Sequence, residues 1–286
     1  MIDYVWYDGD IPRPPYPAVG ARPVLSGLRA TVAEEIALPM EQRGETRADM
    51  REHVDTLTHA LGIEHLKERD PRHLSGGETR LVAVASLLAS GEKEIGLITP
   101  MAGLAEQAVE RLQAACEATS QTVHWLDFSD RPRTLPQRVE PSGARVEREG
   151  IPLTAGGVTR LVGPNGAGKS TTLRRLARAL RAPLSMQFPE AQLILARKSV
   201  EGPHPLDLSL GEQRVVSVKA VTDAPYMLID EPDAGIGPVH WEEIHALLAG
   251  ALARGIAVVL ACHDERFATD VETYACVETI TILRQP

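Results

Sequence analysis

Residues 163–170 read Gly-Pro-Asn-Gly-Ala-Gly-Lys-Ser, the segment of this chain whose residue types and spacing best suit chemistry. The segment fits the pattern G-x-x-x-x-G-K-[ST] at every fixed position. Its glycines let successive backbone N–H groups point inward and hold the β- and γ-phosphates of a nucleotide. Lys169 adds a point charge, and the Ser170 hydroxyl can ligate Mg²⁺. The predicted phosphate-binding residues are Gly163, Asn165, Gly166, Gly168, Lys169, Ser170 and Thr171.

Two acids follow an apolar run further along the chain. The run Met227–Ile229 is followed directly by Asp230 and Glu231. Asp230 suits the holding of Mg²⁺, directly or through water, and Glu231 suits the polarising of an attacking water molecule. His263 follows another apolar run and is predicted to hydrogen-bond the γ-phosphate. With the phosphate loop, these residues predict nucleotide hydrolysis.

The composition of the chain excludes several other classes of protein. Of 286 residues, 43% are hydrophobic and 24% are charged, so whole-chain disorder is excluded. The formal net charge of −9 and an aromatic content of 4% disfavour a protein whose main task is binding nucleic acid. The N-terminus lacks the pattern of a signal peptide, and no run of eighteen apolar residues occurs, so a membrane role requires partners. Cys116, Cys262 and Cys276 are predicted to be reduced core thiols of a cytosolic protein.

The elements around the chemical residues alternate strand and helix. Thr159–Val162 is predicted as a strand that leads into the phosphate loop, and Leu173, Leu176 and Leu180 line one face of the helix after it. Tyr226–Ile229 and Ile256–Ala261 are predicted as parallel core strands. This alternation predicts an α/β layered domain.

The first half of the chain has its own pattern of helices and strands. Met50, Val54, Leu57 and Leu61 form one apolar helical stripe, with Gly62 as the residue that ends the helix. The other predicted elements are a helix over Gly77–Ser90, strands at Ile95–Ile98 and Val123–Leu126, and a helix around Leu104–Cys116. Proline-rich residues 8–23 are predicted to hold no central helix or strand, and residues 129–143 are predicted to be a linker.

From about residue 145 onward, the order of motifs resembles the ATP-binding cassette (ABC) ATPases. Gln187, a signature-like Leu208–Glu212 and His263 occur in the order of that family. The resemblance implies that ATP and Mg²⁺ are the cofactors. It further implies that Glu231, His263 and Gln187 are catalytic and that Ser170, Asp230 and Gln187 hold the metal. Met186–Leu193 looks like the glutamine loop of energy-coupling factor (ECF) importers.

The first half resembles the same family but is incomplete. Thr31–Ile36 is similar to the stretch after the glutamine loop, and Leu74–Glu78 is an intact signature containing Ser75, Gly76 and Gly77. No phosphate loop occurs before residue 150, and Ile98 and Thr99 stand where acids are expected. The favoured interpretation is therefore a cassette that starts in its middle, with Val24 where glutamine is usual. The alternative treats Tyr4–Tyr7 and Arg22–Leu28 as opening strands.

The resemblance predicts two domains, with residues 1–135 a truncated cassette and residues 136–286 a nucleotide-binding domain with a shortened helical subdomain. The implied fold is an α/β P-loop NTPase fold with a parallel-rich sheet. Because ABC cassettes pair head to tail, one composite site is predicted to combine both halves. Its residues are Lys169, Ser170, Gln187, Asp230, Glu231 and His263 with Ser75, Gly76 and Gly77.

The function implied by the resemblance is that of an ATPase subunit of an ABC importer, of ECF type, for a vitamin or a metal ion. Its expected partners are a transmembrane coupling subunit and a substrate-binding membrane subunit, on the inner face of the cell membrane, with no nucleic acid. The two halves pair within one chain, in a homodimer, or with a second ATPase. The alternatives are a soluble ABC ATPase acting on nucleic acid or ribosomes, and a non-hydrolysing ATP-binding regulator. Adenine is expected to lie against Val146, Tyr4, Trp6 or Tyr7.

Overall fold

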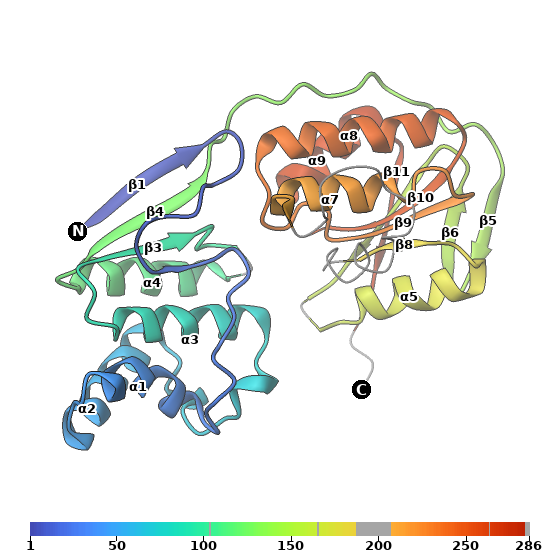
Figure 1. Ribbon diagram of the computed structural model, residues 1–286. Coiled ribbons are helices and arrows are strands. Elements are labelled where there is room, and N and C mark those ends of the chain that lie inside the picture. Colours follow the sequence, from blue (N-terminus) through green and yellow to red (C-terminus); the bar gives the residue numbers. More distant parts are fainter. Residues whose placement is uncertain (103, 165, 187–206, 263, 284–286) are drawn as a thin grey trace. The chain divides into compact units, whose positions relative to one another are not determined.

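The computed structural model describes residues 1–286 except 103, 165, 187–206, 263 and 284–286 (Figure 1). The chain divides into two compact units. Unit 1 comprises residues 1–7 and 11–129, and unit 2 comprises residues 8–10 and 130–286. The division after Ser129 lies at the start of the proline-rich segment in which the linker is predicted.

Unit 1 contains a four-stranded parallel sheet with the strand order β1-β4-β3-β2. The strands are β1 (Ile2–Tyr7), β2 (Ala18–Val19), β3 (Glu94–Ile98) and β4 (Thr122–Phe128). Strands β3 and β4 carry apolar side chains on both faces, as expected of a parallel sheet that other elements cover. Ile95, Val123 and Trp125 are almost completely buried in the core of this unit.

The helices of unit 1 begin and end at the residues that cap them. They are α1 (Val32–Gln42), α2 (Arg47–Leu61), α3 (Gly76–Leu88) and α4 (Glu106–Ala118), with short 3₁₀ turns η1 (Glu64–Leu66) and η2 (Pro71–His73). The predicted apolar stripe lies on α2, and Gly62 ends this helix with a left-handed φ of 69°, which glycine adopts without strain. The predictions for α2, α3, α4, β3 and β4 are confirmed within two residues at most ends.

Unit 2 contains a five-stranded parallel sheet with the order β11-β7-β10-β9-β8 and a separate hairpin, β5-β6. The strands are β5 (Arg145–Arg148), β6 (Ile151–Thr154), β7 (Val158–Val162), β8 (Leu184–Ser185), β9 (Tyr226–Asp230), β10 (Ala257–Ala261) and β11 (Val277–Thr281). The helices are α5 (Lys169–Leu180), α7 (Leu210–Lys219), α8 (Pro238–Ala253) and α9 (Glu265–Tyr274). The predicted strand, loop and helix around residue 163 are therefore present as β7 and α5.

The two sheets repeat one strand order, which bears on the interpretation of the first half. Read from β1, unit 1 has β1-β4-β3-β2, and unit 2 has β7-β10-β9-β8 in the same places. Strand β1 thus has in its sheet the place that β7, which precedes the phosphate loop, has in the other. The alternative interpretation is correct for Tyr4–Tyr7, but residues 22–28 form no strand. The ten residues 8–17 connect β1 to β2, whereas the phosphate loop and α5 lie between β7 and β8.

The structure corrects a further prediction about the cysteines. All three thiols are free, and Cys116 and Cys262 are buried, but Cys276 is exposed at the start of β11. Cys276 is therefore not a core thiol. Among the described residues, no helix is both long enough and apolar enough to cross a membrane.

Candidate nucleotide-binding site

The phosphate loop follows β7 and ends at the first residue of α5. Gly168 caps α5 with a φ of 102°, a conformation that strains other residues. At Gly163, a Cβ atom would lie 2.4 Å from the carbonyl oxygen of Ile282, so only glycine fits there. The loop therefore delivers its backbone N–H groups to the N-terminus of a helix, where the partial positive charge favours a phosphate.

Lys169 lies against the loop that precedes it. Its side chain is buried, and Nζ donates hydrogen bonds to the carbonyl oxygens of Gly163, at 2.7 Å, and Pro164, at 3.4 Å. An ammonium group has three N–H donors, one more than these two acceptors use. Lys169 can thus hold the loop and also contact a phosphate.

Ser170 and Asp230 lie side by side although 60 residues separate them. The Ser170 hydroxyl lies close enough to the Asp230 carboxylate, at the end of β9, to lower the pKa of this carboxylate. Burial raises the pKa of Asp230, and Glu231 raises it further, while Ser170, Arg174 and Arg214 oppose the shift. Asp230 is 2% exposed, and its Oδ1 atom has no hydrogen-bond partner among the described residues. A hydroxyl and a buried carboxylate oxygen without a partner fit Mg²⁺, which prefers oxygen ligands.

Glu231 has a strained backbone. Its φ is 51°, in the left-handed region, and its N–H donates to the carbonyl oxygen of Ala261 on β10 at 2.7 Å. A non-glycine residue in this conformation costs about 1–3 kcal/mol and persists only where its surroundings fix it. The Glu231 side chain is buried directly beside Asp230, where a general base for water is expected.

Three predicted site residues, Asn165, Gln187 and His263, lie outside the described residues. The neighbours of two of them are held by side chains that the sequence analysis missed. Arg214 on α7 donates from Nη1 to the carbonyl oxygen of Met186, at 2.9 Å, and Asp233 accepts from the N–H of Asp264, at 2.7 Å. The sequence offers a signal for Arg214, because an arginine stands at the same place in two similar segments. These are Leu-Ser-Gly-Gly-Glu-Thr-Arg in unit 1 and Leu-Ser-Leu-Gly-Glu-Gln-Arg in unit 2.

The signature residues of unit 1 form the start of α3. Ser75 caps this helix, because its hydroxyl accepts from the N–H of Glu78 while the Glu78 carboxylate accepts from the N–H of Ser75. At Gly76, a Cβ atom would meet no described atom within 4 Å. Packing within the chain therefore does not require glycine at this position, whereas the close approach of a ligand would.

The signature-like residues of unit 2 have the same cap but a different surface. Ser209 and Glu212 form the same reciprocal pair at the start of α7. Leu210, in the place of Gly76, packs partly buried against the core of unit 2. At Gly211, a Cβ atom would lie 2.0 Å from the ring of His240, so this glycine is required by packing. The helix start of unit 2 thus retains its fold and has lost the open glycine surface.

Unit 1 retains the backbone of an acidic site without the acids. Thr99 follows β3 as Glu231 follows β9, with a φ of 46° and an N–H that donates to the carbonyl oxygen of Leu126 at 2.8 Å. Ile98 has the place of Asp230. Without carboxylates and without a phosphate loop, this strand end has no group that would hold Mg²⁺ or activate water.

The candidates for adenine contact differ in their positions. Val146, on hairpin strand β5, is 37% exposed in unit 2. Tyr4 and Trp6, on β1, are 45% and 56% exposed in unit 1, and Tyr7 is partly exposed at the end of the same strand. An aliphatic side chain gives a base less contact area than an aromatic ring.

Comparisons with known proteins find partial relatives of this chain. No protein-family model matches the chain. A stretch of 84 residues, 29% of the chain, is 43% identical to the energy-coupling factor transporter ATP-binding protein EcfA of Methanoculleus marisnigri and covers 30% of that protein. Over 196 residues, 67% of the chain is 30% identical to a putative ABC transporter ATP-binding protein of Methanopyrus kandleri and covers 66% of it. The chain thus matches less than two thirds of the length of both relatives.

A solved structure has a similar fold over most of the chain. It belongs to a model of ribosome-bound archaeal Pelota and ABCE1, and the match covers 88% of this chain and 60% of that chain with a TM-score of 0.54. The sequence identity of this match is 15%, so the likeness concerns the fold alone.

Proposed function

We propose that this chain, which belongs to the ABC ATPase family and has its α/β P-loop fold, hydrolyses ATP at one composite site and thereby drives an importer of ECF type. The observation that carries the proposal is the contact of Ser170 with the buried Asp230, directly beside the strained Glu231. These three residues bring together the groups for Mg²⁺ and for water activation. The similarity to EcfA supports the importer type.

The described residues of unit 2 have distinct roles in this mechanism. The backbone N–H groups after Gly163 and the Lys169 ammonium bind the phosphates and offset their charge. Ser170 and Asp230 would hold Mg²⁺, which neutralises charge that develops on the phosphate oxygens. Glu231 accepts a proton from the attacking water, and its fixed backbone orients the carboxylate for this step.

Unit 1 supplies the opposite side of the composite site. Ser75 and the open surface at Gly76 lie at a helix N-terminus, which offers N–H groups and partial positive charge to the γ-phosphate. The residues that depart from the family pattern support one working site rather than two. A second site would pair the strand end of unit 1, where Thr99 replaces an acid, with the signature-like segment of unit 2, where Leu210 replaces a glycine. We propose that the complete site combines Lys169, Ser170, Asp230 and Glu231 with Ser75, Gly76 and Gly77.

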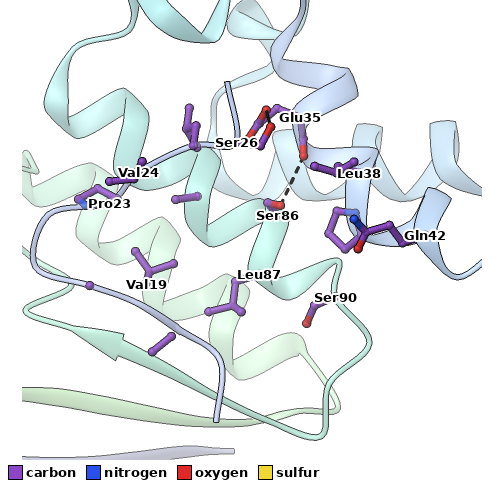
Figure 2. Close-up of a pocket in the computed structure, with 15 residues that line it drawn as sticks. Val19, Pro23, Val24, Ser26, Glu35, Leu38, Gln42, Ser86, Leu87 and Ser90 are labelled. Carbon is purple, nitrogen blue, oxygen red and sulfur yellow. Dashed lines mark hydrogen bonds between the residues drawn. The ribbon is translucent and has the colours of Figure 1, made fainter. Parts of the chain in front are cut away.

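The proposed membrane partner docks in a groove of unit 1. This groove has a volume of about 330 Å³. In Figure 2, residues 18–26 form one side, α1 forms the other, and α3 lies between them. Val24 is 87% exposed at the rim, and the buried carboxylate of Glu35 accepts hydrogen bonds from the N–H and hydroxyl of Ser26. An apolar rim over a satisfied polar floor suits an amphipathic helix of a transmembrane coupling subunit.

Hydrolysis tests the site. We expect Glu231→Gln to retain ATP and to slow hydrolysis by about 10²–10⁴-fold, the usual contribution of a general base. Ser75→Arg should also abolish steady-state hydrolysis, although Ser75 lies in the unit without a phosphate loop, because a bulky cation would fill the signature surface. Wild-type turnover in Ser75→Arg would contradict the composite site, and wild-type turnover in Glu231→Gln would contradict the role of the base.

Co-sedimentation tests the partner. The tagged Glu231→Gln chain with MgATP is incubated with membranes stripped of peripheral proteins, or with purified ribosomes, from the source organism. We expect sedimentation with membranes and its loss in Val24→Glu. The matched control is Leu283→Glu, because Leu283 is 74% exposed in unit 2. Binding to ribosomes instead would favour the soluble ATPase, and equal binding of both variants would contradict docking in the groove.

A further inference from the structure

Arg80 is a buried cation in the helix that begins with the signature. It lies on α3, five residues after Ser75, and is 4% exposed. Its Nη2 atom donates to the carbonyl oxygen of Ala21 at 2.6 Å, and Nη1 donates to the carbonyl oxygen of Ile98 at 3.4 Å. Burial lowers the pKa of Arg80, and Asp127 opposes this shift, but a guanidinium stays charged in proteins.

The contacts of Arg80 join three parts of unit 1. Ala21 begins the segment that continues through Pro23 and Val24 into the wall of the groove. Ile98 ends β3, directly before the strained Thr99. Arg80 itself belongs to the helix whose first turn carries the signature. One side chain thus connects the wall of the partner groove, the end of a core strand and the signature helix.

Burying a guanidinium costs desolvation free energy that an apolar side chain of the same volume would not. Removing a charged group from water costs several kcal/mol unless hydrogen bonds compensate, and an apolar residue of similar size often packs as well. Arg has five N–H donors in a planar fork, which lets one side chain hold two separate carbonyl oxygens. The geometry therefore indicates a role in fixing the relative positions of backbone segments.

Unit 2 has the same arrangement. Arg214, five residues after Ser209, is completely buried and donates to the carbonyl oxygen of Met186, one residue after β8. In unit 1, Ala21 likewise lies two residues after β2. Arg214 also acts electrostatically on Asp230, so in unit 2 it serves the nucleotide site. Unit 1 has the corresponding arginine, Arg80, but no phosphate loop. Arg80 therefore has no nucleotide-binding loop of its own unit to serve.

We propose that Arg80 is a positioning residue that fixes the signature helix to the wall of the partner groove. It holds the helix that carries Ser75–Gly77 in place against the groove wall and the end of β3. The inference rests on the proposed composite site and names the residue that connects this site to the groove.

The test separates binding from turnover in the full-length chain. We expect Arg80→Gln to lower kcat roughly 10–100-fold, because small displacements of positioned groups have effects of this size. The Kd for MgADP should remain within about twofold of wild type, because the residues proposed to bind the ADP phosphates lie in unit 2 and ADP lacks the γ-phosphate that the signature is proposed to meet. Arg80→Lys, which restores one donor to one carbonyl oxygen, should recover part of kcat.

Three variants serve as comparisons. Arg51→Gln removes the same charge from an exposed position on α2 and should behave as wild type. Arg214→Gln should weaken MgADP binding, in contrast to Arg80→Gln. Thermal unfolding of each variant shows whether it is folded, and Arg80→Lys takes the place of Arg80→Gln if the latter does not fold.

Wild-type kcat in a folded Arg80 variant, or a parallel loss of kcat and MgADP affinity, would overturn the positioning role. Ser75→Arg separates this outcome from a failure of the composite site. If Ser75→Arg abolishes hydrolysis while Arg80 variants do not affect it, the composite site stands and only the inference about Arg80 fails. If Ser75→Arg has no effect, the composite site itself is wrong.

Discussion

At the scale of single residues, Glu231 and Thr99 show what unit 1 has lost. Both follow a central strand with a left-handed φ, and both donate an N–H to the neighbouring strand. The strain in Glu231 is explained by a carboxylate that must be fixed beside Asp230. Thr99 bears the same strain without a carboxylate, so unit 1 has the backbone geometry of the site without its acidic side chains.

His245 provides a prediction about stability. It is completely buried on α8, with Nδ1 2.9 Å from the Tyr274 hydroxyl and Nε2 3.5 Å from the Asp270 carboxylate. Burial lowers the pKa of His245 to about 4, while Asp270 and Glu242 oppose the shift and Arg133 supports it.

A lowered pKa in the native state makes the unfolded chain bind more protons between about pH 4 and 6.5. The free energy of unfolding should therefore fall as the pH drops through this window, by roughly 3 kcal/mol at most, and should not fall further from this group below it. The measurement is urea unfolding between pH 4 and 8. His245→Gln should remove this part of the slope, and an unchanged slope in that variant would assign the effect to other groups.

At the scale of elements, α3 and α7 begin with the same cap but present different surfaces. We predict that Gly76→Leu, which introduces the residue found at Leu210, lowers the ATPase rate at least 100-fold. The melting temperature should stay unchanged or rise slightly. The leucine would cover the surface that meets the γ-phosphate, while Cβ atoms fit at this position and leucine favours a helix more than glycine does.

The matched variant is Leu210→Gly, measured for ATPase activity and thermal unfolding. It should destabilise unit 2, because a partly buried leucine is lost. It should not raise the ATPase rate, because unit 1 has no phosphate loop to pair with that signature. Activity retained in Gly76→Leu, or a rate increase in Leu210→Gly, would contradict the assignment of the two helices.

How much the sequence predicted also differs by element. The stripe and Gly62 predicted α2, and the glycine pattern predicted the loop before α5, because local periodicity and backbone requirements determine these elements. The place of β1 could not be predicted, since strand neighbours depend on contacts distant in sequence. Arg80 was missed because a single arginine in a helix is expected to be solvated until its burial is known.

At the scale of the whole molecule, the chain consists of two units with separate apolar cores. The sequence has a phosphate loop in unit 2 alone, and among the described residues the open signature surface and the groove belong to unit 1. Under the proposed function, each unit supplies residues that the other lacks.

This division predicts that calorimetric unfolding has two transitions and that MgADP shifts one of them. A ligand at 100 times its Kd stabilises the unit that binds it by about 2.7 kcal/mol. We expect the transition of unit 2 to rise by several degrees and that of unit 1 to stay constant. Lys169→Ala should abolish the shift, and an equal shift of both transitions would contradict independent units.

The distribution of the three cysteines has a practical consequence. Burial raises the pKa of Cys116 and Cys262 to about 12, so these thiols scarcely ionise at neutral pH, and both lie inside the fold. Cys276 is exposed, so a maleimide can reach its sulfur, whereas the two buried thiols are both inaccessible and un-ionised. The natural sequence therefore provides a selective attachment point for one fluorophore on unit 2. A second cysteine introduced on α2 would carry the other fluorophore on unit 1, so that energy transfer between the dyes would measure the distance between the units with and without nucleotide.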